Sequence, residues 1–201
     1  MPIPMGRIAD VEINEFSFPM LYLWRREEID SGGPGRYRGG LGGASCFIPH
    51  DSPLQGVHLV VSAPGKALPL APGLAGGYPS ATSYDVLMRG TNVRAMLAKG
   101  FIPGTLEEID GRHEILPSHV ETDMAADDVY FTHWQGGGGY GDPLRRDPQQ
   151  VAVDVASFRV SPRAASEIYG VMLKADGTAD ASATEACRGE LRHARIGPRA
   201  V

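Results

Sequence analysis

The 201-residue sequence lacks the features that would assign it to several common classes of protein. It has only two cysteines, Cys46 and Cys187, which are too few for a disulfide framework and too far apart for a metal motif. No apolar run approaches the ~20 residues that span a membrane. The first residues lack the basic start and apolar run of a signal peptide. We therefore expect a cytoplasmic protein with reduced thiols.

The charge distribution argues against a nucleic-acid-binding protein. The chain carries 24 acidic and 19 basic residues, a formal net charge of −5, and has no stripe of lysine and arginine. The segment Gly35-Arg36-Tyr37-Arg38-Gly39 has the composition of some RNA-binding segments. The overall acidity and the lack of a repeat disfavour that interpretation.

The sequence contains no motif of a self-sufficient catalytic site. The nucleophile elbow Gly-x-Ser-x-Gly and the Walker Gly-Lys-Ser/Thr are both missing. The six histidines form no His-x-x-x-His or His-x-His pair. The nearest approach to a metal cluster is His113 and His119 beside Glu114, Glu121 and Asp123, for which a solvated loop is the alternative. We expect no catalytic residue, no metal site and no bound cofactor on this chain alone.

Glycine, by contrast, is abundant: it supplies 26 of the 201 residues, against about 7% in average proteins. No Gly-X-Y period is present, which excludes collagen. A hydrophobic content of 42% excludes a disordered linker. The glycines gather in three clusters, at residues 30–43, 73–77 and 135–143.

The third cluster, Gln135-Gly-Gly-Gly-Gly-Tyr-Gly-Asp-Pro143, follows a strand-like run at 129–134 and precedes a helix signal. This order can build an anion cradle; a structural turn or a subunit contact is the alternative. Four successive glycines cost about 0.5–1 kcal/mol each relative to alanine. We therefore expect the loop to be ordered and to contact a partner subunit or a cleft between subunits.

The candidate binding or interface residues lie in and around these clusters. Arg36 and Arg38 have the chemistry to clamp an anion or to pair with a neighbouring subunit. His133 can point into a cleft, and the alternative is a histidine that is packed in the fold or caps an element. Asp142 can position a carboxylate or phosphate, or it can cap a turn. The full set is Arg36, Arg38, His133, Gly136, Gly137, Gly138, Gly139, Tyr140 and Asp142.

Residue periodicity and turn chemistry predict an α+β fold with a β-rich N-terminal two-thirds, glycine-rich loops and a helical C-terminal third. We expect a single domain over residues 1–201. The expected strands are 11–16, 21–29, 44–48, 56–62 and 129–134, with a hairpin at Asp110-Gly111 between 106–109 and 113–116. The expected helices are 93–99, two that start at Asp147-Pro148 and Ser161-Pro162, and one that starts at a capping box, Ser182-x-x-Glu185.

Three long motifs together resemble the hydantoinase B/oxoprolinase family. They are Asp30-Ser-Gly-Gly-Pro-Gly-Arg-Tyr-Arg-Gly-Gly40, Gly73-Leu-Ala-Gly-Gly77, and a third that runs from Gly136 through Arg146-Asp147-Pro148 to Ala183-Thr184. Their order and approximate spacing are those of the family, and the similarity spans residues 11–188. The chain departs from the family at Ala126-Asp127 and around Ala63-Pro64-Gly65-Lys66.

This resemblance implies that the chain is one part of a larger enzyme. Family members are longer, and these motifs lie in their C-terminal part, so the chain resembles a separate or truncated C-terminal piece of a B-type subunit. The implied partners are a hydantoinase A-type subunit and the remaining N-terminal B-type chain, with ATP and a divalent metal on those partner chains. The implied reaction is ATP-dependent hydrolysis of a cyclic amide C–N bond. The alternatives are a ketone carboxylase of the acetone or acetophenone type, or a purely structural subunit.

Overall fold

The computed structural model describes residues 10–52 and 56–196, and confirms an α+β fold with strands in the first part and helices in the last. The described chain falls into two compact units. The first, which we call the β unit, comprises residues 10–26, 44–63 and 84–133. The second, the helical unit, comprises residues 27–43, 64–83 and 134–196. Whether 1–201 acts as a single domain stays a prediction.

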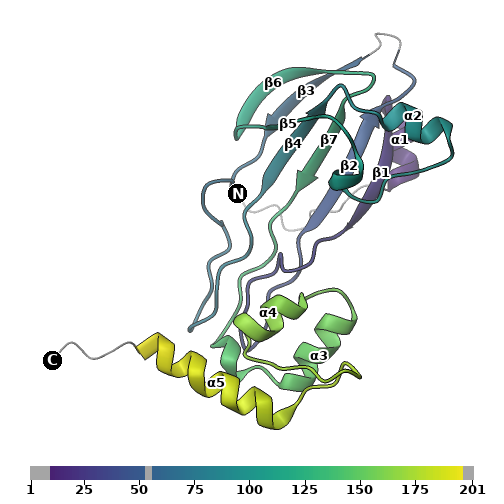
Figure 1. Ribbon diagram of the computed structural model, residues 1–201. Helices are drawn as coiled ribbons and strands as arrows, with labels where there is room; N and C mark the ends of the chain where they lie inside the picture. The colour runs from purple at the N-terminus through teal and green to yellow at the C-terminus, as the bar shows by residue number, and fades with distance from the viewer. Residues whose placement is uncertain (1–9, 53–55, 197–201) are drawn as a thin grey trace. The chain divides into compact units, whose positions relative to one another are not determined.

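A five-stranded antiparallel sheet forms the centre of the β unit (Figure 1). The strand order is β1-β2-β7-β4-β5. The strands are β1 (Met20–Glu27), β2 (Gly43–Pro49), β7 (Val129–His133), β4 (Tyr84–Arg89) and β5 (Arg112–Ile115). Alternation along β4 and β7 fixes which side chains face the core, because neighbouring residues of a strand point to opposite faces. Val86 and Phe131, paired across these strands, lie on one face, and Leu87 and Tyr130 on the other.

The first face of this sheet carries the larger core. Leu23, Cys46, Ile48 and Met88 are buried there, together with Val93 at the start of a short helix. That helix is α2 (Val93–Ala98), close to the predicted helix at 93–99. Burial raises the pKa of the Cys46 thiol far above its ordinary value, with only a small opposing effect of Arg26. Cys46 is therefore an inert core residue, as its apolar strand predicts.

The second face of the sheet is covered by a two-stranded antiparallel ribbon, β3 (Gly56–Ser62) with β6 (His119–Ala125). Val61 and Met124 of the ribbon pack in one cluster with Leu87 and Tyr130 of the sheet. The outward side chains of the ribbon, among them His58, remain exposed. This pairing places residues 57 to 69 positions apart in the sequence directly opposite one another.

The prediction of a strand at 11–16 is wrong, because this segment forms the helix α1 (Val11–Ser17). Asp10 caps it: the Asp10 carboxylate accepts hydrogen bonds from the backbone N–H groups of Glu12 and Ile13. Such a cap stabilises a helix by about 0.5–2 kcal/mol. The helix has no buried residue, so the alternation of apolar and polar residues at 11–16 does not mark side chains that are buried in a core.

Two further local predictions need correction, and two strands were missed. The expected hairpin at Asp110-Gly111 does not form, because Leu106–Glu108 is a 3-10 helix, η1, and β5 pairs with β4. The last helix, α5 (Ala181–Ile196), is capped by Asp180, whose carboxylate accepts the Ala183 N–H, and not by Ser182. The strands β4 and β6 were not predicted.

Short helices with the predicted start signals build much of the helical unit. They are η2 (Pro143–Arg145), α3 (Pro148–Ala156) and α4 (Pro162–Glu167), followed by α5. Asp147 and Ser161 cap α3 and α4 as expected, with proline in the first turn of each. Their apolar faces enclose Val151, Ala165 and Tyr169. Among the described residues, no helix is long and apolar enough to cross a membrane.

Candidate functional site

Three irregular segments in the helical unit are joined by backbone hydrogen bonds. We call them the glycine layer, which comprises residues 31–43, 71–81 and 135–142. Gly33 donates its N–H to the Gly137 carbonyl (2.8 Å) and Gly139 donates to the Tyr78 carbonyl (2.9 Å). Tyr78 in turn donates to the Pro34 carbonyl (2.7 Å). The glycine loop is therefore held by its own chain, although no strand is formed.

Backbone-to-backbone packing explains why the layer needs glycine. A Cβ on Gly138 would collide with the Pro72 carbonyl, and a Cβ on Gly139 would collide with the Pro34 carbonyl, at separations that real Cβ atoms do not show. Gly40 is different, since a Cβ there would meet nothing within 4 Å. Contacts within the chain thus account for Gly136, Gly138 and Gly139, and a contact with a partner subunit stays a prediction.

Two of the predicted interface residues, Arg36 and Tyr140, lie exposed on the glycine layer. Tyr140 and Tyr37 exchange backbone hydrogen bonds of 2.9 Å in both directions, and their ring centroids are 6.3 Å apart. The Arg36 guanidinium lies 5.6 Å from the Tyr37 ring centroid. Both aromatic rings are more than half exposed. The structure thus presents an aromatic pair and a cation on one rigid backbone.

Arg38, the other predicted arginine, is placed in an ion pair inside the unit. Its Nη2 lies 3.3 Å from Asp154 Oδ1, while Arg146 Nη2 lies 2.8 Å from Asp154 Oδ2. All three side chains are largely buried, with Asp154 only 5% exposed. Neither Asp154 nor Arg146 was included among the candidate site residues in the sequence analysis. A buried carboxylate could have been inferred from the spacing, because Asp154 follows Val151 by three residues and so lies on the same apolar face of α3.

Asp142 takes the capping role that the sequence offered as one alternative. Its carboxylate accepts the Leu144 N–H (3.0 Å) at the start of η2 and pairs with Arg195 of α5 (2.9 Å). Partial burial opposes ionisation of Asp142. The hydrogen bonds from Leu144 and Arg195, with the charge of Arg145, nevertheless lower the pKa of its carboxyl below the ordinary value.

His133 belongs to the β unit and is packed there. It ends β7, is only 5% exposed, and stacks on Tyr84 with ring centroids 4.8 Å apart. The packed alternative of the sequence analysis therefore describes His133.

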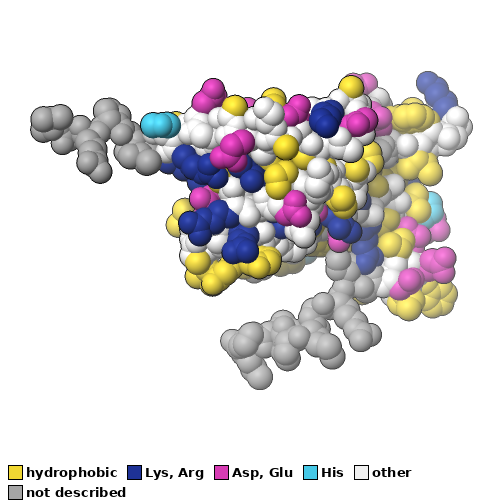
Figure 2. Space-filling model, turned by 90° about the horizontal axis from the view of Figure 1, so that it is seen from below, with side chains coloured by type: hydrophobic (Ala, Val, Ile, Leu, Met, Phe, Trp, Pro, Cys, Tyr) yellow, Lys and Arg dark blue, Asp and Glu magenta, His cyan; other side chains and the backbone are white. Residues whose placement is uncertain are grey.

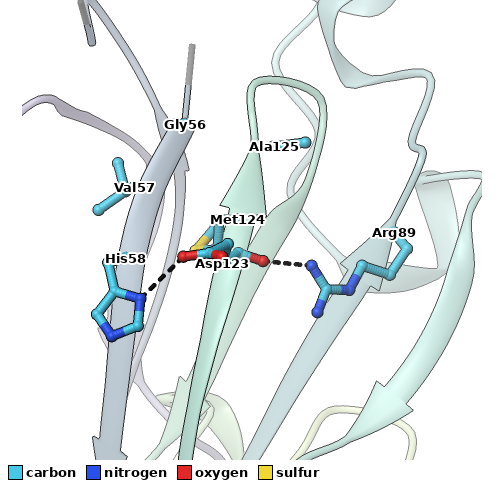
Figure 3. A pocket seen from close by; sticks show the side chains of 7 residues that line it. All are labelled: Gly56, Val57, His58, Arg89, Asp123, Met124 and Ala125. Carbon is cyan, nitrogen blue, oxygen red and sulfur yellow. Dashed lines mark hydrogen bonds and ion pairs between the residues drawn. The ribbon is translucent and has the colours of Figure 1, made fainter. Parts of the chain in front are cut away.

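A surface hollow of about 380 Å³ lies in the β unit (Figure 3). Its lining includes His58, Arg89 and Asp123. His58 Nδ1 lies 2.8 Å from Asp123 Oδ1, because the two residues are opposite one another in the β3–β6 register. The hydrogen bond to Asp123 raises the pKa of His58 above its ordinary value. Nothing in the linear sequence spacing of His58 indicated this pair.

The chemistry of this hollow is limited. Arg89 already donates to Asp128 (2.9 Å), Thr122 (2.8 Å) and Glu114 (3.3 Å). The residues lining the hollow include no serine or cysteine beside the histidine. Across residues 10–52 and 56–196, no three His, Cys, Asp or Glu side chains come together to hold a metal. The hollow therefore offers an oriented histidine, but no complete catalytic constellation.

Sequence comparison relates the chain to known proteins along most of its length. The family model described as hydantoinase B/oxoprolinase matches residues 1–143. The chain is 34% identical to the acetone carboxylase alpha subunit of Xanthobacter autotrophicus, covering 96% of this chain and 27% of that relative. It is 33% identical to the caprolactamase subunit beta of Pseudomonas jessenii, covering 90% and 28%. An acetophenone carboxylase delta subunit of Aromatoleum aromaticum is also 33% identical, over 83% and 25%.

Structural comparison gives relatives of two of these kinds. The nucleotide-free structure of acetone carboxylase superposes with a TM-score of 0.81 at 30% identity, covering 98% of this chain and 28% of that one. The crystal structure of the ATP-dependent caprolactamase from Pseudomonas jessenii superposes with a TM-score of 0.70 at 29% identity, covering 90% and 28%. The chain thus spans only about a quarter of the length of the relatives it matches.

Proposed function

Because the chain belongs to the hydantoinase B/oxoprolinase family, we propose that it is one part of a multi-subunit, ATP-dependent enzyme that acts on the carbonyl group of a small molecule. The observation that carries the proposal is the superposition on acetone carboxylase over 98% of the chain. Since the chain spans 28% of that relative, it supplies only part of the working unit.

We place the main catalytic groups, ATP and a divalent metal on partner chains. Two observations support this: the described residues form no metal-holding group, and the lining of the hollow that contains His58 includes no serine or cysteine. The partners we propose are an A-type subunit and the remaining N-terminal part of the B-type chain. In this arrangement, the two units of the chain supply a rigid support and a contact surface. A purely structural subunit is the limiting case.

Two reactions fit this frame, and the comparisons support both. Carboxylation of a small ketone is favoured by the acetone carboxylase superposition, with its TM-score of 0.81. Hydrolysis of a cyclic amide, the reaction first expected from the resemblance, is favoured by 33% identity to caprolactamase over 90% of the chain. The two structural relatives described above are ATP-dependent enzymes by name. We propose ketone carboxylation as the reaction of the complex, with lactam hydrolysis as the alternative.

Bicarbonate separates the two reactions. The complex isolated with a tagged form of this chain is incubated with ATP and either acetone with labelled bicarbonate, or caprolactam without it. Carbon fixation that needs ATP, acetone and bicarbonate would establish the carboxylase. Ring opening that needs ATP but not bicarbonate would establish the amidohydrolase. A complex that consumes no ATP with either compound, or with a panel of related ketones and cyclic amides, would contradict the proposal.

A further inference from the structure

An exposed apolar patch lies on the glycine layer of the helical unit. Tyr37 is 60% exposed, Tyr140 is 56% exposed and Leu74 is 62% exposed. Isolated β-bridges connect Tyr140 to both Tyr37 and Leu74, so the three residues come from three different segments and lie on adjoining backbone. We call these three residues the tyrosine patch. Neighbouring exposed aromatic side chains of this kind are enriched at binding surfaces rather than on bare ones.

The tyrosine patch rests on a backbone that cannot move easily. Leu74 donates its N–H to Gly139 and accepts from Gly141, both at 2.9 Å. A Cβ on Gly139 or Gly77 would collide with neighbouring backbone, so the segments below the patch are in direct contact. Binding to such a surface costs little ordering of the backbone, and tyrosine itself has few torsions to fix. The patch therefore has the preorganisation of an interface hot spot.

A cationic side chain, Arg36, lies beside the tyrosine patch. The Arg36 guanidinium lies against the Tyr37 ring, and Arg36 makes no ion pair within the described part of the chain. Asp142, the acid next to Gly141, is already neutralised by Arg195. In Figure 2, Lys and Arg side chains gather beside apolar ones on the face seen there. An unpaired guanidinium group beside exposed aromatics complements a segment that carries carboxylates and apolar side chains.

We propose that the tyrosine patch binds an acidic, apolar segment of a partner protein subunit. The proposal rests on the proposed function, in which the chain is one part of a larger assembly. The chain spans 27% of the acetone carboxylase alpha subunit, so relatives of this kind contain much protein that is available to cover the patch. A second copy of the chain is the less suitable occupant, because a two-fold contact at the patch would oppose Arg36 to its own equivalent.

Site-specific photocrosslinking tests the proposal on the intact complex. Separate variants carry p-benzoylphenylalanine in place of Tyr37, Tyr140 or, as a control, Phe158. Phe158 is an aromatic residue of the same unit with 81% exposure, and it lies between α3 and α4, outside the patch. We expect Tyr37→p-benzoylphenylalanine and Tyr140→p-benzoylphenylalanine to crosslink to one acidic segment of another subunit. The Phe158 variant should not reach that segment.

A double variant measures what the patch contributes. Tyr140→Ser with Arg36→Gln should reduce the partner subunit recovered with the tagged chain about tenfold, while circular dichroism and the unfolding midpoint stay near those of the parent. Crosslinks to a second copy, crosslinks to no protein, or unchanged recovery in the double variant would each overturn the proposal. The outcome does not depend on catalysis: crosslinking in a complex without ATP-dependent turnover would leave the patch assigned and the proposed function refuted.

Discussion

At the scale of single residues, several glycines of the helical unit allow other backbone segments to pack directly against them, because glycine has no Cβ. The Gly139 position is buried beside the Pro34 and Gly33 carbonyls. Neither Gly139 nor Gly40 has the positive φ that would itself demand glycine. Close approach of another backbone, and not turn geometry, is therefore what selects glycine at position 139.

We predict that Gly139→Ala lowers the free energy of unfolding by about 1–3 kcal/mol, the usual cost of forcing an extra methyl group into packed surroundings. Urea unfolding followed by circular dichroism measures it. Gly40→Ala is the matched control, because its new Cβ would meet nothing within 4 Å. That control should shift stability by less than about 1 kcal/mol, in the stabilising direction if at all. Equal tolerance of both substitutions would show that the layer is loosely packed.

At the scale of elements, one buried carboxylate ties the helix α3 to the first glycine segment. Asp154 of α3 pairs with Arg38 and with Arg146. Removing one member of a buried ion pair leaves uncompensated buried charge, which costs several kcal/mol. Here the loss would leave two guanidinium groups beside each other.

We predict that Asp154→Asn lowers the free energy of unfolding by about 3–5 kcal/mol. The control is Glu167→Gln, which removes an exposed carboxylate paired with Arg163 at 2.9 Å within α4. Exposed pairs of this spacing contribute about 0.3–0.5 kcal/mol. Chemical unfolding of both variants at pH 7 makes the comparison. A small effect of Asp154→Asn would mean that the two arginines find other acceptors or water.

The β3–β6 ribbon contains a titrating pair on its exposed face. The hydrogen bond to Asp123 favours protonated His58 in the folded chain and so raises its pKa. A raised pKa contributes stability that is fully present below the unfolded value of about 6.5 and is lost as pH rises through the folded value.

We predict that Asp123→Asn lowers the pKa of His58, as measured by NMR titration of the imidazole signals. Asp51→Asn, which removes an exposed carboxylate 3.7 Å from His50, is the control for net charge and should leave the His58 titration in place. If both variants shift His58 equally, a general field effect and not the cross-strand hydrogen bond is responsible.

At the scale of the whole molecule, the chain spans about a quarter of the length of the relatives it matches, and its described residues form no group that could hold a metal. We predict that the isolated chain turns over neither acetone with bicarbonate nor caprolactam in the presence of ATP, and that the complex with its partner subunits does. Coupled ATP assays and product detection measure both. Robust turnover by the isolated chain would contradict this division of labour.

We predict that the glycine loop links folding to assembly. Gly138→Val should prevent formation of an active complex, because its side chain would collide with the Pro72 carbonyl. The Gly40→Ala variant again serves as the control. Size-exclusion chromatography and ATP-dependent turnover distinguish the two variants. If the Gly138→Val complex assembles and turns over like the parent, the loop serves only as a connector.

Local chemistry in the sequence was sufficient to predict the α+β class, most of the strands, and the starts of α3 and α4, since a cap residue followed by proline acts over one turn. It failed at α1, where period-two alternation suggested a strand but the Asp10 cap and following backbone bonds gave a helix. It also failed to predict the partner of β5, because β5 pairs with β4, about 25 residues away, and not with the segment just before it.

Which chemical groups meet was decided only by the tertiary structure. Sequence motifs identified the family and marked the glycine clusters, because those signals are carried by residue identity and order. The pairing of Arg38 with Asp154, 116 positions apart, and of His58 with Asp123, 65 positions apart, depends on long-range packing and strand register. The same holds for the contact of Tyr37 with Tyr140. Such contacts form because distant segments of the backbone pair or pack side by side in the folded chain. No local sequence pattern specifies which segments these are.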